Sequence, residues 1–453
     1  MSELLITYLA DDLTGATDVL EQLTGAGVRT VLFFTAPDAT TLARFPGVQA
    51  VGVAGTARSL GGEALDQEIR PALAALAEFR APVCHYKVCS TFDSSPRRGN
   101  IGRALELGRE VCRPALVAVL GGSPLLNRYC VFGNLFAAGA VAVDGSAYRL
   151  DRHPTASVHP ATPMTESDLR RVLGEQTNLR IELFDVLQYR RSTDEQRALL
   201  ARLQSGSAAV LFDVLEDSHL DCFAALIEDS ASSAAPAFVV GSSGVETALC
   251  RRWSRAGLIP ASAAWDEATL QQVLVGSGSC SPVTATQIDW AVRSGFAEVA
   301  LDAPALVSAA STSGALDRAC AAASEHLAAG RNVVVHAAKG PADGRIRATR
   351  AALGDAAGAR SAEALGRAIG QLIDRCLEHS PRTRVCLAGG DTSSFAAREL
   401  GIEALEMARP LSPGAPVCRV SAPGRAADRV EFTFKGGQVG AEPFFGQLAG
   451  GGR

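Results

Sequence analysis

The 453-residue sequence lacks most of the short signatures that would reveal a compartment or a partner directly. It contains no Cys-x-x-Cys pair, and its 11 cysteines are scattered. This disfavours zinc and disulfide frameworks and indicates the reduced thiols of a cytoplasmic protein. No apolar run has the length of a membrane span, and the first residues resemble no secretory signal, so we expect no membrane partner. The net charge of −5 disfavours a nucleic-acid partner.

Several catalytic signatures are absent as well. No Gly-x-x-x-x-Gly-Lys-Ser/Thr occurs, which excludes a P-loop, and the run GSGSCS has Ser281 where a dinucleotide fingerprint needs its third glycine. No Gly-x-Ser-x-Gly occurs, which disfavours a serine hydrolase. The aspartates Asp11 and Asp12 are adjacent, whereas a phosphatase of the haloacid dehalogenase type needs Asp-x-Asp. A nucleotide site of a less usual type remains open.

What the sequence does contain is a regular alternation of apolar, strand-like runs with helix-like runs. With 47% hydrophobic and 20% charged residues, the chain can form large cores. The alternation predicts an α/β fold, with two α/β domains whose largely parallel sheets face each other across an interdomain cleft. The pattern weakens in RAGLIPASAAWDE, so we place the domains at residues 1–258 and 259–453. The expected strands are 4–10, 30–34, 48–54, 82–88, 115–120, 181–186, 208–213, 237–240, 271–275, 298–301, 332–336, 384–388, 417–421 and 430–434.

The stretch ADDLTGA, Ala10 to Ala16, places two carboxylates side by side where a buried strand ends. One aspartate is explained by capping of the following helix, because a carboxylate accepts hydrogen bonds from the first free N–H groups. Two adjacent carboxylates repel each other and call for a nearby cation or donor. Ligands bind at the carboxyl ends of strands in open α/β sheets, so a cap and a site are both open here.

A second polar segment follows the expected strand 82–88. Within HYKVCSTFDSSPRRGN, the cationic, hydroxyl and amide side chains lie close together in a loop. Lysine and arginine beside hydroxyl groups suit a hydroxylated acid, whose carboxylate pairs with the cations. A solvated loop before a capped helix is the alternative. The candidate residues are Lys87, Ser90, Thr91, Arg98 and Asn100, with Arg58 after the strand 48–54 as a further carboxylate partner.

Three glycine loops punctuate the second half of the chain. Each follows an expected strand: GSGSCS from Gly276, GGDTS from Gly389 and KGGQVG from Lys435. Glycine lets backbone N–H groups approach an anion closely, and a following helix adds a favourable dipole. One such loop is ordinary, but parallel strands bring three of them to a common edge, which favours a phosphate site.

Taken in order, ADDLTGA, KVCST…RRGN, HPATPM, GSGSCS, GGDTS and KGGQVG resemble the four-carbon acid sugar kinase family, over nearly the whole chain. The family includes 3-oxo-tetronate and D-threonate kinases. The resemblance implies an N-terminal domain for the acid sugar, a C-terminal domain for ATP, and phosphoryl transfer to the terminal hydroxyl. Many members read Lys-x-Asp-Ser-Thr here, whereas this chain has Cys89 in place of that aspartate and a longer loop. The change calls tetronate and threonate specificity into question. The expected substrate is therefore a four-carbon acid sugar such as 3-oxo-tetronate, threonate or erythronate, or a branched or keto acid resembling 3-oxo-isoapionate.

The resemblance and the polar clusters together assign roles to the candidate residues. Asp12, or else Asp11, takes the hydroxyl proton, while Lys87 and Arg58 hold the substrate carboxylate. Mg²⁺ is expected to arrive with ATP, and Asp391 is the candidate to orient it through a water. A homo-oligomer is compatible with the sequence, and a non-catalytic nucleotide or acid-sugar sensor is the alternative function. The expected nucleotide contacts are Ser277, Ser279, Gly389, Gly390, Asp391, Thr392, Gly436 and Gly437.

Overall fold

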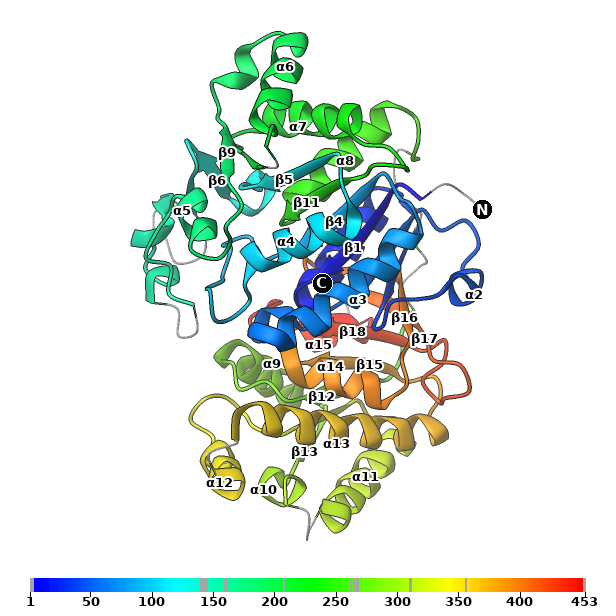
Figure 1. The fold of residues 1–453 in the computed structure, drawn as a ribbon. Coiled ribbons are helices and arrows are strands. Elements are labelled where there is room, and N and C mark those ends of the chain that lie inside the picture. The colour runs from blue at the N-terminus through cyan, green and yellow to red at the C-terminus, as the bar shows by residue number, and fades with distance from the viewer. Residues whose placement is uncertain are drawn as a thin grey trace. The chain divides into compact units, whose positions relative to one another are not determined.

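The computed structural model shows two compact units, Met1–Ala263 and Ala264–Arg453 (Figure 1). It describes residues 4–138, 146–158, 162–206, 208–260, 263, 265, 269–308, 312–354 and 357–450. The sequence prediction placed the domain boundary at residue 258, and the two units divide at Ala263. Each unit is an α/β structure of mostly parallel strands and connecting helices, as the alternating pattern predicted.

The main sheet of the first unit is parallel throughout its described strands, in the order β2-β3-β1-β4-β11-β5-β10-β9. Its central strands are buried along their whole length and, apart from His85 and Lys87 in β4, largely apolar, which explains why most of them appear in the sequence as apolar runs. The strands are β1 (Ile6–Ala10), β2 (Thr30–Phe33), β3 (Ala50–Ala54), β4 (Val83–Lys87), β5 (Leu116–Leu120), β9 (Ile181–Phe184), β10 (Ala209–Phe212) and β11 (Ala237–Gly241).

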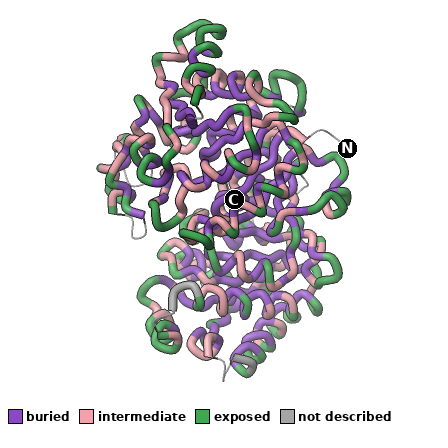
Figure 2. Tube along the Cα trace, viewed as in Figure 1, coloured by how far each residue is buried: buried purple, intermediate pink, exposed green. Residues whose placement is uncertain are grey.

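Crossover helices connect these strands and pack in two groups. α3 packs against α4, while α8 packs against both α1 and α7. Figure 2 shows the sheet as the buried centre of the unit, with exposed residues on the outer turns of the helices. The helices are α1 (Leu13–Gly25), α2 (Ala39–Leu42), α3 (Gly62–Glu78), α4 (Ile101–Cys112), α5 (Leu169–Gly174), α6 (Thr193–Leu203), α7 (Asp217–Ser230) and α8 (Gly244–Arg255).

A small antiparallel sheet interrupts this pattern after β5. It consists of β6 (Arg128–Val131), β7 (Asn134–Ala137) and β8 (Tyr148–Arg149). The sequence analysis did not predict it, because its strands are short and only partly buried and therefore carry a weak apolar signal.

The second unit combines a parallel core with an antiparallel addition, in the order β13-β14-β12-β15-β18-β17-β16. The first five of these strands are parallel to one another, whereas β17 and β16 each run antiparallel to the preceding strand in that order. The strands are β12 (Val273–Ser277), β13 (Ala297–Ala300), β14 (Val333–His336), β15 (Arg384–Ala388), β16 (Ala404–Ser412), β17 (Ala415–Ser421) and β18 (Glu431–Lys435).

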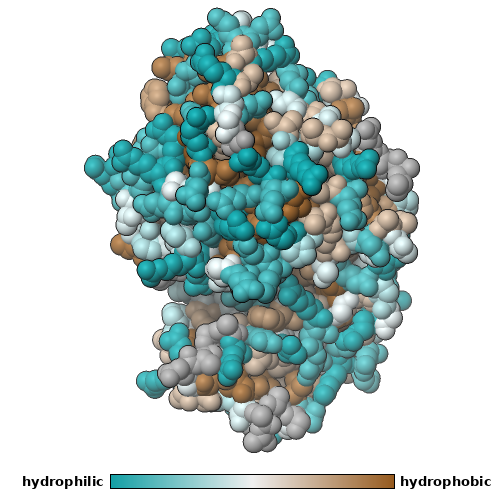
Figure 3. Space-filling view, viewed as in Figure 1, coloured by the Kyte–Doolittle hydropathy of each residue, from teal (hydrophilic) through white to brown (hydrophobic). Residues whose placement is uncertain are grey.

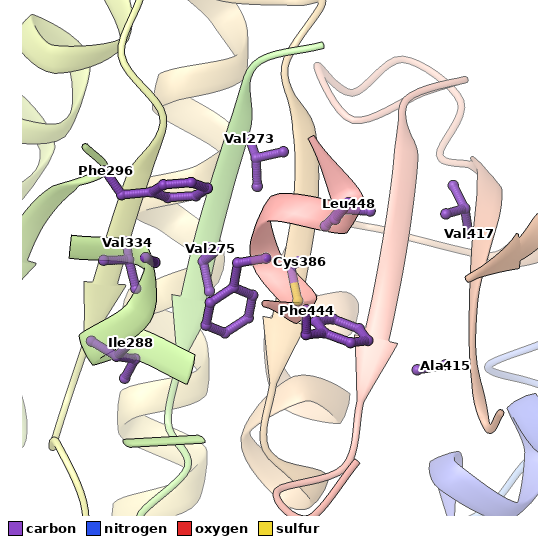
Figure 4. Packing of buried hydrophobic residues seen from close by; sticks show 12 residues of the cluster. Val273, Val275, Ile288, Phe296, Val334, Cys386, Ala415, Val417, Phe444 and Leu448 are labelled. Carbon is purple, nitrogen blue, oxygen red and sulfur yellow. The ribbon is translucent and has the colours of Figure 1, made fainter. Parts of the chain in front are cut away.

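Helices again pack against the sheet of the second unit. On one side, α15 packs on α9, and their aromatic and aliphatic side chains meet β12, β14 and β15 in one cluster that includes Val275, Ile288 and Phe444 (Figure 4). The long helix α13 contacts α11, α12 and α14. The helices are α9 (Pro282–Arg293), α10 (Ala303–Leu306), α11 (Thr312–Ala328), α12 (Gly344–Leu353), α13 (Ala357–His379), α14 (Gly390–Glu399) and α15 (Phe444–Leu448).

The two units share one local topology. In each, the first strand lies inside the sheet, the next two strands lie on one side of it, and the chain then crosses to the other side, giving β2-β3-β1-β4 and β13-β14-β12-β15. The strand order therefore reverses at β1 and at β12, and ligands bind beyond the carboxyl ends of strands at such switch points.

The molecular surface carries both hydrophilic and apolar side chains. On the face drawn in Figure 3, hydrophilic side chains are interspersed with smaller apolar patches. Among the helices that the structure describes, none combines the length and apolarity needed to cross a bilayer.

Candidate functional site

The switch point of the first unit carries a cluster of charged side chains. The neighbouring strands β3, β1, β4 and β11 end at the same edge of the sheet. Asp11 and Asp12 directly follow β1, Arg58 lies just beyond β3, and Lys87 is the last residue of β4. The structure thus brings together four residues that the sequence singled out.

Arg58 bridges the two adjacent aspartates. Its Nε and one terminal nitrogen donate to the Asp11 carboxylate at 3.1 and 2.7 Å, and the other terminal nitrogen donates to Asp12. Asp12 is also the N-cap of α1, because its Oδ1 accepts from the Gly15 N–H at 2.6 Å. The question raised by the paired aspartates is answered here: Asp12 is the cap, and one guanidinium pairs with both carboxylates.

The protonation of this cluster follows from burial and charge. Burial raises the pKa of Asp11, Arg58 acts to lower it, and the neighbouring Asp12 adds to the rise. Burial acts to lower the pKa of Arg58, but Asp11 and Asp12 outweigh it, so the guanidinium stays charged. Arg58 is therefore fully engaged by carboxylates within the cluster.

Lys87 is held by a residue that the sequence analysis did not select. Its Nζ lies 3.2 Å from Asp18 on α1, and Ser243 at the start of α8 donates to the same Asp18 oxygen. Burial acts to lower the pKa of Lys87, but the carboxylates Asp18, Glu246, Asp11 and Asp12 together raise it. Lys87 is thus a buried cation with its own carboxylate partner.

The loop after β4 lies beside the Arg58 turn. The Gly99 N–H donates to the Leu60 carbonyl at 2.8 Å, and a Cβ at Gly61 would collide with the Arg97 carbonyl, so this approach requires glycine at position 61. Arg98 is exposed, and its side chain has no ion-pair partner among the described residues.

Two of the hydroxyl and amide side chains predicted from the same loop already have hydrogen-bond partners within the protein. Thr91 donates to Asp93 at 2.8 Å and lies 3.1 Å from the Cys89 sulfur. Asn100 caps α4 by accepting from the Arg103 N–H at 2.6 Å, so its side chain has a structural use. Ser90 is half-buried. Of the segment HPATPM, residues 159–161 lie outside the described part of the chain.

In the second unit, the three glycine loops meet at the carboxyl ends of β12, β15 and β18. The Gly278 N–H donates to the Ala388 carbonyl at 3.0 Å, and the Gly389 N–H donates to the Lys435 carbonyl at 2.9 Å. Thr284, at the start of α9, donates to the Gly437 carbonyl at 2.9 Å. The structure therefore brings the three loops together as the sequence predicted.

The close packing of these loops leaves no room for side chains. A Cβ at Gly278 would collide with Thr392, one at Gly389 would lie 3.2 Å from the Ser279 nitrogen, and one at Gly437 would lie 2.9 Å from the Ser279 hydroxyl. Gly389 also has φ +129°, a conformation that glycine adopts most easily. The backbone groups of the three loops thus lie close together and form a candidate cradle for phosphate groups.

The helix that follows the second loop adds to this cradle. α14 begins at Gly390 without a side-chain cap, so its first N–H groups point outward at the positive end of the helix dipole. Thr392 is buried and Asp391 is exposed in this first turn, while Ser277 is fully buried at the end of β12. Gly436 lies directly after the strand β18.

Lys435 is the second buried lysine at a strand end. Its Nζ donates to the Thr284 hydroxyl at 3.1 Å and to the Gly436 carbonyl at 3.0 Å, and it lies 5.8 Å from the Phe444 ring centre. No carboxylate of the described residues lies within ion-pair distance. Burial lowers the pKa of Lys435 to about 8, while Cys386 acts weakly the other way.

The donor set for a metal is small. Among the described residues, no three His, Cys, Asp or Glu side chains cluster so as to hold an ion. Asp391, exposed next to the cradle, offers one carboxylate. Because Mg²⁺ commonly binds through one or two carboxylates together with substrate phosphates, this set fits a magnesium ion that arrives with a nucleotide.

Asp18, Ser243 and Lys435 are the polar residues that the sequence analysis left out of its site. The serine carried a usable signal, because Ser242 and Ser243 follow an expected strand, as the aspartates do. Lys435 was visible as the residue before a glycine pair. Asp18 had no such signal, since it lies inside a helix and only the packing of α1 against α8 and β4 brings it to the site.

Comparison with known proteins agrees with this division of the chain. Residues 6–249 match a family model described as a sugar-binding N-terminal domain, and residues 274–445 match a nucleotide-binding C-terminal domain. The charged cluster of the first unit thus lies in the sugar-binding domain, and the three loops lie in the nucleotide-binding domain.

Individual relatives cover almost the whole chain. A 3-oxo-isoapionate kinase of Paraburkholderia graminis is 42% identical over 98% of this chain and 94% of its own length. A 3-oxo-tetronate kinase of Methylobacterium radiotolerans is 31% identical over 98% of each chain. A crystal structure from Salmonella typhimurium LT2 superimposes with a TM-score of 0.76 at 25% identity, over 97% of each chain. The chain belongs to the four-carbon acid sugar kinase family, and it is an acid sugar kinase, a phosphotransferase.

Proposed function

We propose that this chain phosphorylates 3-oxo-isoapionate, or a closely related 3-oxo acid sugar, on a terminal hydroxyl with ATP. The observation that carries the choice of acid is the identity to a 3-oxo-isoapionate kinase, which clearly exceeds that to the 3-oxo-tetronate kinase. The departure of the loop at Cys89 from the common family pattern supports the same choice.

In the proposed site, Asp12 accepts the hydroxyl proton. Arg58 holds both carboxylates in place, and Asp12 keeps its orientation through the Gly15 N–H. Since phosphoryl transfer depends mainly on positioning and charge, the rigid bridge matters more than the strength of the base. Asp11, buried and paired with two guanidinium nitrogens, serves to orient Arg58.

ATP is proposed to bind with its phosphates on the three glycine loops. Gly278, Gly389 and Gly437 let the three loops pack closely against one another, and the start of α14 contributes N–H groups. Mg²⁺ bound to the phosphates would neutralise their charge, and Asp391 is the residue placed to orient it. Ser279 and Thr392 line the same loops.

The first test is ADP release from Mg-ATP with 3-oxo-isoapionate, 3-oxo-tetronate, threonate and erythronate. We expect the highest kcat/KM with 3-oxo-isoapionate, and NMR of the product then locates the phosphate. A higher kcat/KM with 3-oxo-tetronate would contradict the choice of acid. No turnover with any of the four acids would contradict the substrate class.

Asp12→Asn tests the proposed base. Asparagine caps helices as well as aspartate does, so the variant keeps α1 and loses only the charge. We expect kcat to fall about 10²- to 10⁴-fold, with little change in acid binding. Asp38→Asn is the matched control, because Asp38 caps α2 in the same way, by accepting from the Thr41 N–H at 2.7 Å. Near-normal turnover of Asp12→Asn would exclude Asp12 as the base.

A further inference from the structure

An acid sugar brings a carboxylate, and the charged cluster at β1 has no free cation to receive it. Arg58 is shared by Asp11 and Asp12, and Lys87 is paired with Asp18. A substrate carboxylate at either cation would have to compete with these partners, at close range to several negative charges. A further cation close to the cluster would avoid this competition. Arg98 is exposed on the loop after β4, and Arg128 is partly buried; the inference below concerns Arg128 and rests on the proposed function.

Arg128, on β6, is a guanidinium that has no carboxylate partner among the described residues. One terminal nitrogen donates to the carbonyls of Leu126, Asn127 and Ala138 at 2.8, 3.3 and 2.7 Å. Its Nε is buried, and none of the described residues accepts a hydrogen bond from it. Three carbonyls thus hold the side chain in place while one edge of the guanidinium lacks an acceptor.

This guanidinium lies near the loop that follows β4. Burial lowers the pKa of Arg128, whereas the nearby groups of Cys89 and Asp93 act to raise it. Cys89 is also close enough to Arg58 for each to influence the pKa of the other. Cys89 therefore lies within electrostatic range of both guanidinium groups, one paired with carboxylates and one not.

We propose that Arg128 binds the carboxylate of the acid sugar through the guanidinium edge that lacks an acceptor. A carboxylate there would satisfy Nε and compensate a charge that burial otherwise disfavours. The hydroxyl end of the sugar would then point toward Asp12, with the loop of Cys89 between the two ends. Arg58 and Lys87 keep the aspartates in position and do not bind the carboxylate, which revises the role that the sequence analysis gave them.

The test compares an acid with its neutral analogue. Binding of the best acid of the panel, or of threonate if none is turned over, and of its primary amide is measured by calorimetry without ATP. Arg128→Gln should raise the Kd of the acid about 30-fold or more, as expected for the loss of a charged hydrogen bond, and that of the amide less than about threefold. Arg128→Lys retains the charge and should recover part of the acid affinity.

Arg149→Gln is the matched control, because Arg149 belongs to the same small sheet but pairs with Asp151 at 2.6 and 2.7 Å. It should change neither affinity. Equal losses for acid and amide in Arg128→Gln, or no loss, would overturn the inference even if the wild-type enzyme is an active kinase. Selective loss of acid binding in a chain that turns over no acid would uphold it while contradicting the proposed reaction. Circular dichroism and urea unfolding of each variant monitor whether the first unit is folded.

Discussion

Replacing Lys435 with methionine should have opposite effects on stability and on nucleotide binding. Lys435 is 1% exposed and has no carboxylate partner among the described residues, but it fastens the third glycine loop to Thr284. Methionine has a similar length and carries neither charge nor donor. The variant therefore removes a buried charge and, with it, a lysine close to the proposed phosphate cradle.

The magnitude follows from the pKa of Lys435. A fall from its ordinary value of 10.5 to about 8 corresponds to on the order of 3 kcal/mol of unfavourable free energy while both states are protonated, below pH 8. Between pH 8 and 10.5 the folded protein releases this proton before the unfolded chain does. The unfolded state then binds more protons, so wild-type stability rises with pH through this window.

Against this gain stand the two hydrogen bonds of the lysine Nζ, at roughly 1 kcal/mol each. At pH 7 the Lys435→Met variant should be about 1 kcal/mol more stable than the wild type. Above pH 10.5 it should be about 2 kcal/mol less stable, because the wild type no longer carries the buried charge. The difference in the free energy of unfolding between wild type and Lys435→Met therefore changes sign with pH.

The assay is urea unfolding at pH 7 and pH 10.5, followed by the fluorescence of Trp290, which packs on the core of the second unit. The other two tryptophans, Trp253 and Trp265, are replaced by phenylalanine in every protein compared. Lys339→Met is the control, since Lys339 is partly exposed and paired with Asp289 and Glu298. The KM for ATP should rise about tenfold or more in Lys435→Met at pH 7. A stability difference that does not change with pH would refute the reasoning.

Two further predictions concern the cradle and the charged cluster. Gly278→Ala should push Thr392 away, and it should therefore raise the KM for ATP at least about tenfold and destabilise the second unit by about 1–3 kcal/mol. The control Gly344→Ala has open space around the new methyl group, so it should change neither the KM nor the stability. Asp18→Asn should leave Lys87 buried without its ion-pair partner and lower stability by about 3 kcal/mol in chemical unfolding, together with a fall in kcat. The control Asp194→Asn breaks a far more exposed ion pair, so it should change the stability by less than about 0.5 kcal/mol and kcat by less than about twofold. An equal effect of Asp18→Asn and Asp194→Asn would contradict the role of Asp18.

Much of the fold was predictable because parallel strands covered by helices are apolar along their whole length. β1, β3 and β4 could be located in the sequence for this reason, and their ends located Asp11, Asp12 and Lys87. The strand β16 was missed, since it contains Pro410 and several polar residues and is only partly buried. Its pairing with β17 depends on a partner that no local pattern reveals.

The site was predictable to the extent that it follows strand ends. Asp18 reaches Lys87 from inside a helix, and Arg128 comes from a short antiparallel strand, so neither stands at the position where the parallel-sheet rule points. The position of a residue at a strand end also does not show which side chains form ion pairs with one another. The parallel-sheet rule placed Arg58 near the aspartates but could not show that the guanidinium already pairs with both of them.

The reversal of strand order at β1 and at β12 has a consequence for how the two ligands influence each other's binding. Each unit has a switch point of its own, so the residues proposed to hold the acid sugar and those proposed to hold ATP come from separately cored bodies. Any departure from multiplicative binding constants in the ternary complex is a heterotropic free energy between the units, measurable in a thermodynamic cycle with ADP and the acid.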